Sequence, residues 1–134
     1  MTHSAILLEK SEVSKNQLVV FLSGISGQSH SERFAGITKI ANEAGYDCAR
    51  LDLWGNDRDI QSLSYEVLFN NLNEIFAEFE KAGYEKIIMI GKSFGGGLAL
   101  LYQHSLIVKK IMWAPAIGVG EGVGNFGEYF NRVL

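Results

Sequence analysis

A serine flanked by glycines two positions away on each side lies in the stretch Gly91 to Gly95, which has the sequence Gly-Lys-Ser-Phe-Gly. The β-branched run that ends at Ile90 predicts a buried strand before it, and the apolar run from about Phe94 predicts a helix after it. A strand that turns directly into a helix strains the residue at the turn and exposes its side chain at the carboxyl edge of the sheet. Ser93 is therefore a candidate nucleophile for acyl transfer.

The residues around Ser93 fit this chemistry. Gly91 and Gly95 lack the Cβ atoms that would collide with neighbouring backbone in so tight a turn. At the N-terminus of a helix, backbone N–H groups and the positive end of the helix dipole can stabilise an oxyanion. The apolar run through Leu98 and Leu101 predicts a helix that is covered on every side. The alternative is that Ser93 is only a small residue in a tight turn.

The same residues also match part of a phosphate-binding loop. Gly91-Lys92-Ser93 could end a Gly-x-x-x-x-Gly-Lys-Ser pattern, but that pattern needs a glycine at the position occupied by Lys86. It also needs several loop residues between the strand and the lysine, whereas here the strand runs directly into Gly91. The spacing therefore favours a nucleophile over a nucleotide site.

Composition predicts a single soluble domain over residues 1–134, of which 47% are apolar and 20% charged. A net charge of −3 without a basic cluster argues against nucleic acid as a partner. The one cysteine, Cys48, excludes an internal disulfide and is expected to be a buried, inert thiol. No metal ion or cofactor is expected, because the sequence has no Cys/His cluster at zinc spacing. Without a signal peptide or a long apolar run, we expect a cytoplasmic protein with no membrane span.

Predicted strands and helices alternate along the chain. We expect strands at residues 4–10, 17–22, 47–53, 87–90 and 109–113. A capping box, Ser29-x-x-Glu32, predicts the start of the first helix, and Gly45 and Gly83 are expected to end the first two helices. The second helix runs to about Lys81, with a predicted buried stripe of Val67, Leu68, Leu72, Ile75, Phe76 and Phe79. This alternation predicts an α/β fold, a three-layer sandwich with a mostly parallel sheet and helices on both faces.

The end of the chain differs from the rest. Residues 118–127 are rich in glycine, and residues 126–134 carry apolar side chains at helical spacing. The chain ends on Val133 and Leu134 without a C-cap, whereas domains normally finish on exposed polar residues. Residues 126–134 are therefore a candidate docking element, either for another chain in an oligomer or for a missing C-terminal segment.

These features, in this order, resemble the N-terminal portion of an α/β-hydrolase. The resemblance covers residues 17 to 117, and the matching parts are Val19-Val20-Phe21-Leu22 with the loop Ser23 to Gly27, Ala44-Gly45-Tyr46, Asp52-Leu53-Trp54-Gly55, the Ser93 turn, and Trp113-Ala114-Pro115. It implies an esterase- or lipase-like serine hydrolase. Its small-molecule ester or acyl substrate would form an acyl-Ser93 intermediate.

The resemblance also implies where an oxyanion would be bound. The Phe94 N–H matches one of the family's two oxyanion donors. The family's other donor loop usually has the sequence His-Gly-x-x-Gly. Here Ser23 replaces the histidine and Gly24 is kept, so the second donor would be the Ile25 N–H. Backbone donors tolerate such a change, so the oxyanion hole is expected to survive it.

The rest of the family's catalytic machinery is not evident. Its acid and histidine follow the serine on later strands, so we expect a chain truncated before both. His104 should lie roughly 16 Å down the helix from the serine, at 1.5 Å per residue. His3 precedes the first strand, which leaves His30, in the loop beside the oxyanion hole, as the candidate base. Its alternative is a solvent-facing loop residue.

Other residues near the expected site have structural alternatives. Asp52 and Asp57 follow a strand, where they could lie near the substrate but are expected to cap or solvate the loop. Trp54 and Trp113 could line an acyl pocket but are expected to be part of the core. Lys92 is expected to be a solvated turn residue. The primary hypothesis is a serine hydrolase, and the alternative is a catalytically inactive α/β-hydrolase-like module for binding or interaction.

Overall fold

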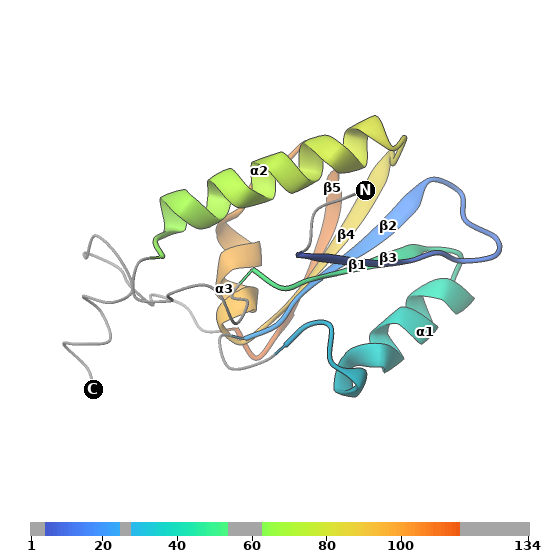
Figure 1. Ribbon diagram of the computed structural model, residues 1–134, viewed down its shortest axis with the longest axis horizontal. Coiled ribbons are helices and arrows are strands. Elements are labelled where there is room, and N and C mark those ends of the chain that lie inside the picture. Colours follow the sequence, from blue (N-terminus) through green and yellow to red (C-terminus); the bar gives the residue numbers. More distant parts are fainter. Residues whose placement is uncertain (1–4, 25–27, 54–62, 116–134) are drawn as a thin grey trace.

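A five-stranded sheet with helices on both faces forms the part of the chain that the computed structural model describes, residues 5–24, 28–53 and 63–115 (Figure 1). Its strands are β1 (Ile6–Glu9), β2 (Gln17–Leu22), β3 (Asp47–Leu51), β4 (Lys86–Lys92) and β5 (Ile107–Trp113). Its helices are the short 3₁₀ helix η1 (Glu32–Phe34), α1 (Ala35–Glu43), α2 (Tyr65–Lys81) and α3 (Phe94–Leu101). The predicted α/β class is confirmed. The predicted docking element at residues 126–134 lies outside the described residues.

The strand order is β1-β3-β2-β4-β5, with β1 antiparallel to β3 and the other neighbours parallel. From β2 the chain continues through α1 to β3 on one side, and from β4 it continues through α3 to β5 on the other side. β2 and β4 are neighbours where this direction changes. Such a switch point is where open α/β sheets bind ligands, outside the carboxyl ends of the strands.

The two faces of the sheet are covered differently. α2 and α1 lie on opposite sides of the sheet (Figure 1). The main core contains large apolar side chains of α2 and α3, among them Phe76, Phe79 and Leu98, packed on alternate residues of the strands. The α1 face has a smaller cluster in which Val19 and Cys48 pack against Ala41. Cys48 is fully buried as predicted, and burial raises the pKa of its thiol.

The long helix follows the prediction except at one position. α2 begins after Ser64, whose hydroxyl accepts a hydrogen bond from the Val67 N–H at 3.2 Å, and it ends before Gly83, which has φ +94°. Five of the six predicted stripe residues are buried, but Val67 is 39% exposed. Val67 precedes Leu68, so it lies about 100° around the helix from the buried stripe, on the flank.

The predicted capping box at the first helix is wrong. Ser31 is the N-cap of η1, and Ser29 is fully buried, with its Oγ accepting a hydrogen bond from the Ser23 N–H at 3.1 Å. The hydroxyl of Ser29 therefore serves the end of β2 instead of a helix end. The predicted helix stop at Gly45 is confirmed by its φ of +88°.

The prediction that the last helix is covered on every side is also wrong. Residues from Phe94 to Ala99 are buried, but Leu100 and Leu101 are 41% and 51% exposed. α3 packs on β4 and β5 next to α2, and these elements do not reach the outer side of its last turn. Lys110 of β5 ends the helix by donating to the carbonyl oxygens of Leu100 and Tyr102 at 3.0 and 2.6 Å.

No helix within residues 5–24, 28–53 and 63–115 combines the length and the apolar content that crossing a bilayer requires.

Candidate active site

Ser93 alone links β4, which ends at Lys92, to α3, which begins at Phe94. Its backbone has φ 55° and ψ −120°, a strained conformation for a residue with a side chain. The Ser93 N–H donates to the Trp113 carbonyl oxygen at 2.9 Å, and its own carbonyl oxygen accepts from the Gly96 N–H at 2.9 Å. The turn is therefore held from both sides, and the predicted strained geometry is confirmed.

Glycines permit this turn because backbone fills the space around it. A Cβ added to Gly91 would lie 2.6 Å from the Gly96 Cα, and one added to Gly95 would lie 2.5 Å from the Leu22 carbonyl oxygen. A Cβ atom does not approach backbone carbon or oxygen atoms this closely unless the backbone moves. A Cβ at Gly96 would lie 3.0 Å from Pro115, a tight contact, so this further glycine also relieves crowding at the turn.

The end of β2 lies directly beside the serine. A Cβ added to Gly24 would be 3.2 Å from the Cβ and 3.6 Å from the Oγ of Ser93. The loop that was expected to supply an oxyanion donor is therefore adjacent to the candidate nucleophile at Gly24. Ile25, the predicted donor, lies outside the described residues, and its role stays a prediction.

Phe94 is the first residue of α3, so its N–H belongs to the helical turn whose amides point toward the N-terminus. Its side chain is 4% exposed and stacks on Tyr65, with the ring centroids 6.3 Å apart. Packing of this ring fixes the start of α3 against α2. The position suits an oxyanion donor, although that role also stays a prediction.

His30 contacts the sheet two strands away from the serine. Its Nε2 lies 3.0 Å from the carbonyl oxygens of both Ala5 and Arg50. Because carbonyl oxygens only accept hydrogen bonds, Nε2 must carry the hydrogen. Arg50 belongs to β3, and β2 separates β3 from β4, a spacing of roughly 10 Å. A role for His30 as the base, which stays a prediction, would have to use Nδ1.

The other described histidine, His104, lies beyond the far end of α3, as expected. Its Nε2 is 3.3 Å from a carboxylate oxygen of Glu80, near the end of α2, and its Nδ1 accepts from the Leu106 N–H at 3.2 Å. These contacts hold it away from the turn at Ser93. In both histidines of the described residues the Nε2 atom is engaged elsewhere, by two carbonyl oxygens in His30 and by the Glu80 carboxylate in His104.

Sequence comparison identifies the family of this chain. The family model described as "alpha/beta hydrolase fold" matches residues 17–111. The chain belongs to the α/β-hydrolase fold family. Comparison with functionally curated proteins finds no relative.

Solved structures of α/β-hydrolases have the same fold. Est1E from Butyrivibrio proteoclasticus, solved with ferulic acid bound, has a TM-score of 0.75 and 21% identity over 87% of this chain and 50% of its own. Monoacylglycerol lipase from Paleococcus ferrophilus has a TM-score of 0.66 and 22% identity over 96% and 50%. MenH from S. aureus has a TM-score of 0.67 and 21% identity over 84% and 43%. This chain thus spans about half the length of each.

Two side chains beside the site differ from expectation. Trp113 is 48% exposed at the end of β5, so it does not fill the core. The Lys92 Nζ lies over its ring, 5.2 Å from the centroid, so Lys92 is a half-buried partner of the tryptophan and not a freely solvated residue. The Asp52 N–H donates to the Ala5 carbonyl oxygen at 2.8 Å. Trp54 and Asp57 lie outside the described residues.

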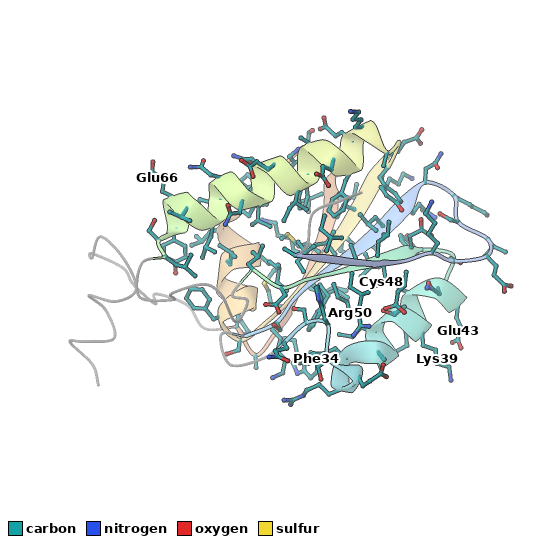
Figure 2. All side chains as sticks on the ribbon, in the orientation of Figure 1. Phe34, Lys39, Glu43, Cys48, Arg50 and Glu66 are labelled. Carbon is teal, nitrogen blue, oxygen red and sulfur yellow. The ribbon has the colours of Figure 1, made fainter. Side chains whose placement is uncertain are left out.

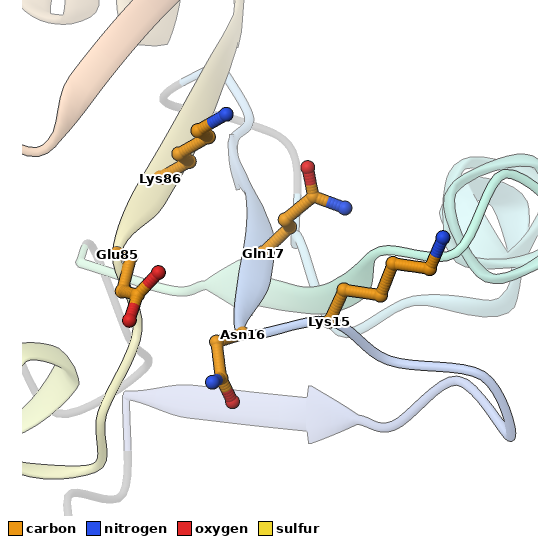
Figure 3. A pocket seen from close by; sticks show the side chains of 5 residues that line it. All are labelled: Lys15, Asn16, Gln17, Glu85 and Lys86. Atoms are coloured by element: carbon orange, nitrogen blue, oxygen red, sulfur yellow. The ribbon is translucent and has the colours of Figure 1, made fainter.

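A surface pocket lies at the opposite edge of this α/β-hydrolase sheet (Figure 3). It is lined by Lys15, Asn16, Gln17, Glu85 and Lys86, at the amino ends of β2 and β4. The seven residues of β4 separate it from Ser93. At 3.3 Å per residue this is roughly 20 Å. The pocket is therefore unrelated to the turn. Among the described residues, no three His, Cys, Asp or Glu side chains form a group that could hold a metal ion.

Proposed function

We propose that this chain is a serine hydrolase that cleaves a small-molecule ester or another acyl compound through an acyl-Ser93 intermediate. The observation that carries the proposal is the strained Ser93, with φ 55°, presented at the start of α3 beside Gly24. The names of two structurally similar proteins, a ferulic acid-bound Est1E and a monoacylglycerol lipase, support an acyl substrate.

In the proposed reaction, the Ser93 Oγ attacks the carbonyl carbon of the substrate while a general base takes the hydroxyl proton. The carbonyl electrons move onto oxygen, and this oxyanion accepts hydrogen bonds from the N–H groups of Phe94 and Ile25. One such donor contributes roughly 10²- to 10³-fold in kcat. Collapse of the tetrahedral intermediate expels the alcohol, which receives the proton, and water then hydrolyses acyl-Ser93 by the same steps.

We place the base and its acid outside the described residues. In the order of this family they follow the serine. After Ser93 the printed sequence holds one histidine, His104, which bonds to Glu80 at the far end of α3. The chain also spans about half the length of the similar structures. A longer chain, in which a later segment supplies both groups next to Ser93, is therefore part of the proposal.

A fluorophosphonate probe, which phosphonylates activated serines, tests the proposal. We expect it to label the peptide that contains Ser93, detected as its mass shift, most strongly in a chain extended along its reading frame beyond Leu134. Ser93→Ala should abolish labelling, and Ser105→Ala, at an exposed serine beyond α3, should not. If an extended chain with a downstream acid and histidine remains unlabelled at Ser93, the hydrolase proposal is wrong.

A second candidate function is a binding module without catalysis. Two observations favour it, namely the Nε2 of His30 bound to two carbonyl oxygens and Ser23 at the position where the family usually has histidine. Such a module would not hydrolyse p-nitrophenyl esters, and Ser93→Ala would leave its ligand affinity unchanged. Hydrolysis that is lost in Ser93→Ala would exclude it.

A further inference from the structure

Arg50 and Ser29 are among the buried polar residues that the reaction above does not use. Arg50 of β3 is 3% exposed and Ser29 is fully buried. Figure 2 shows Arg50 between the sheet and α1. Burying a charge or a hydroxyl is costly unless its hydrogen bonds are made, so the partners of these side chains indicate what the burial achieves.

Arg50 fixes the backbone at Ser29 and Ser31, which follow residues 25–27 in the sequence. Its Nη1 donates to the carbonyl oxygens of Ser29 and Ser31 at 3.1 and 2.8 Å, and its Nη2 donates to a carboxylate oxygen of Glu9 at 2.7 Å. The hydroxyl of Thr38 donates to the same oxygen at 3.2 Å. Because a guanidinium is planar and rigid, binding Glu9 at one nitrogen orients the other toward the two carbonyl groups.

Ser29 carries this constraint across to the end of β2. Its Oγ accepts a hydrogen bond from the Ser23 N–H at 3.1 Å, and Ser23 is also fully buried. The next residue, Gly24, lies against the Cβ and Oγ of Ser93. A continuous set of bonds thus connects Glu9, Arg50, Ser29 and Ser23, and it ends beside the candidate nucleophile.

We propose that Ser29 and Arg50 are positioning residues that hold the Ser23–Gly24 backbone in place against Ser93. The catalytic consequence rests on the proposed function, because the held backbone leads into the expected oxyanion donor. Displacing a catalytic group by about 1 Å can cost on the order of 10²-fold in rate, so loss of a positioning bond should lower kcat while leaving substrate binding nearly intact.

The central experiment compares Ser29→Ala with Ser31→Ala. The two changes remove the same hydroxyl two residues apart, but the Ser31 Oγ only accepts a long 3.4 Å bond from the Arg33 N–H in η1. With p-nitrophenyl acetate and an active form of the protein, we expect Ser29→Ala to lower kcat roughly tenfold, a smaller loss than removal of a whole oxyanion donor causes, with KM changed less than twofold. Ser31→Ala should keep the kcat of the unmodified protein.

A second variant pair tests Arg50. Arg50→Lys keeps the positive charge and loses the planar fork, so it should lower kcat without a comparable change in KM. Arg33→Lys makes the same substitution at an exposed arginine whose guanidinium lies over the Phe34 ring, 5.1 Å from its centroid. It should leave kcat unchanged. Equal effects of the two lysine substitutions would overturn the role of Arg50.

Amide hydrogen exchange measured by NMR gives a readout that needs no turnover. In Ser29→Ala, exchange of the Ser23 and Gly24 amides should accelerate at least tenfold, while the Val20 amide inside β2 and the whole of α2 keep their rates. If an extended chain with a downstream acid and histidine shows no Ser93-dependent turnover, the proposed function fails, and this exchange pattern still decides whether Ser29 holds the segment.

Three results would overturn the inference. The first is unchanged exchange at Ser23 and Gly24 in Ser29→Ala. The second is faster exchange there in an active protein whose kcat does not change. The third is a uniform acceleration of exchange over the whole chain with kcat and KM changing together, because that pattern would show a general loss of stability and no positioning role.

Discussion

The two faces of the sheet bury different kinds of side chain. On the α2 and α3 face the core is almost entirely apolar and includes Phe76, Leu72 and Leu98. On the α1 face a small apolar cluster lies beside the bonded group of Arg50, Glu9 and Ser29. One face therefore supplies most of the hydrophobic stabilisation, whereas the other, as proposed above, sets the position of the backbone beside Ser93.

The typical energies of apolar burial and of hydrogen bonds support this division between the two faces. Complete burial of one large apolar side chain contributes about 1.5–3 kcal/mol. A hydrogen bond contributes a net of only about 1 kcal/mol, but leaving a buried donor or acceptor without its partner costs about 1–3 kcal/mol. Substitutions on the first face should therefore change global stability most, and those on the second face should change local geometry for a smaller loss of stability.

The largest effect is expected from Phe76→Ala. Phe76 is fully buried, and its ring lies 5.1 and 5.5 Å from the rings of Tyr102 and Phe79. Removing it should lower the free energy of unfolding by about 3–5 kcal/mol, because the change loses apolar burial and leaves a cavity. Urea denaturation measures this loss. Ile40→Ala, at a residue of α1 that is 71% exposed, is the control, and an equal loss there would contradict the comparison.

Arg50→Met should have an intermediate effect on stability. It leaves the carbonyl groups of Ser29 and Ser31 without their donor, at a cost of about 1–3 kcal/mol in the free energy of unfolding. Arg33→Met, which removes an exposed arginine from a ring contact, should cost less than about 1 kcal/mol. If urea denaturation gave Arg50→Met a loss as large as that of Phe76→Ala, the polar group would be a main source of stability.

Alkaline pH should lower stability through two tyrosines of the apolar face, in addition to the buried Cys48 thiol of the α1 face. Burial and the nearby Glu80 carboxylate raise the pKa of Tyr102 to about 12. Burial and the hydrogen bond to Asp47 also raise the pKa of Tyr84. Because these pKa values are higher in the folded state, the stabilisation is complete below the unfolded value near 10 and is lost as the pH rises toward 12.

For Tyr102, the free energy of unfolding is expected to fall by about 1 kcal/mol per pH unit between pH 10 and 12. Urea denaturation at several pH values measures it. Tyr102→Phe should flatten the dependence, although it also removes the hydrogen bond to Asn73, so each variant is compared with itself at pH 8. A pH dependence that is the same with and without the hydroxyl would show that Tyr102 does not contribute.

The smallest effect is expected from Val67→Ala. Val67 is 39% exposed on the flank of α2, and alanine has the higher helix propensity, so the free energy of unfolding should change by less than about 0.5 kcal/mol. Its neighbour Leu68 is fully buried, and Leu68→Ala should cost about 2–5 kcal/mol. Similar losses for the two variants would mean that the boundary of the apolar face is wrongly placed.

Much of the fold could be predicted because its signals are local in the sequence. The alternation of strands and helices, the helix ends at Gly45 and Gly83, and the strained turn at Ser93 all depend on residues within a few positions of one another. The glycines around Ser93 are needed because backbone atoms occupy the space that a Cβ atom would take at these positions. The exposed side chains of Leu100 and Leu101 could not be predicted in this way, because their exposure depends on which other elements reach that side of α3.

By itself, the sequence determined the family, the elements of the sheet and the residue at the turn, since hydrophobic periodicity and glycine spacing are properties of neighbouring residues. Only the tertiary structure decided that Ser29 bonds to Ser23 instead of capping a helix and that Arg50 holds the loop beside it. It also decided that His30 donates to two carbonyl groups of separate segments. The physical reason is that a polar side chain bonds to whichever group packing brings within about 3 Å, and these partners are 6 to 25 residues away along the chain.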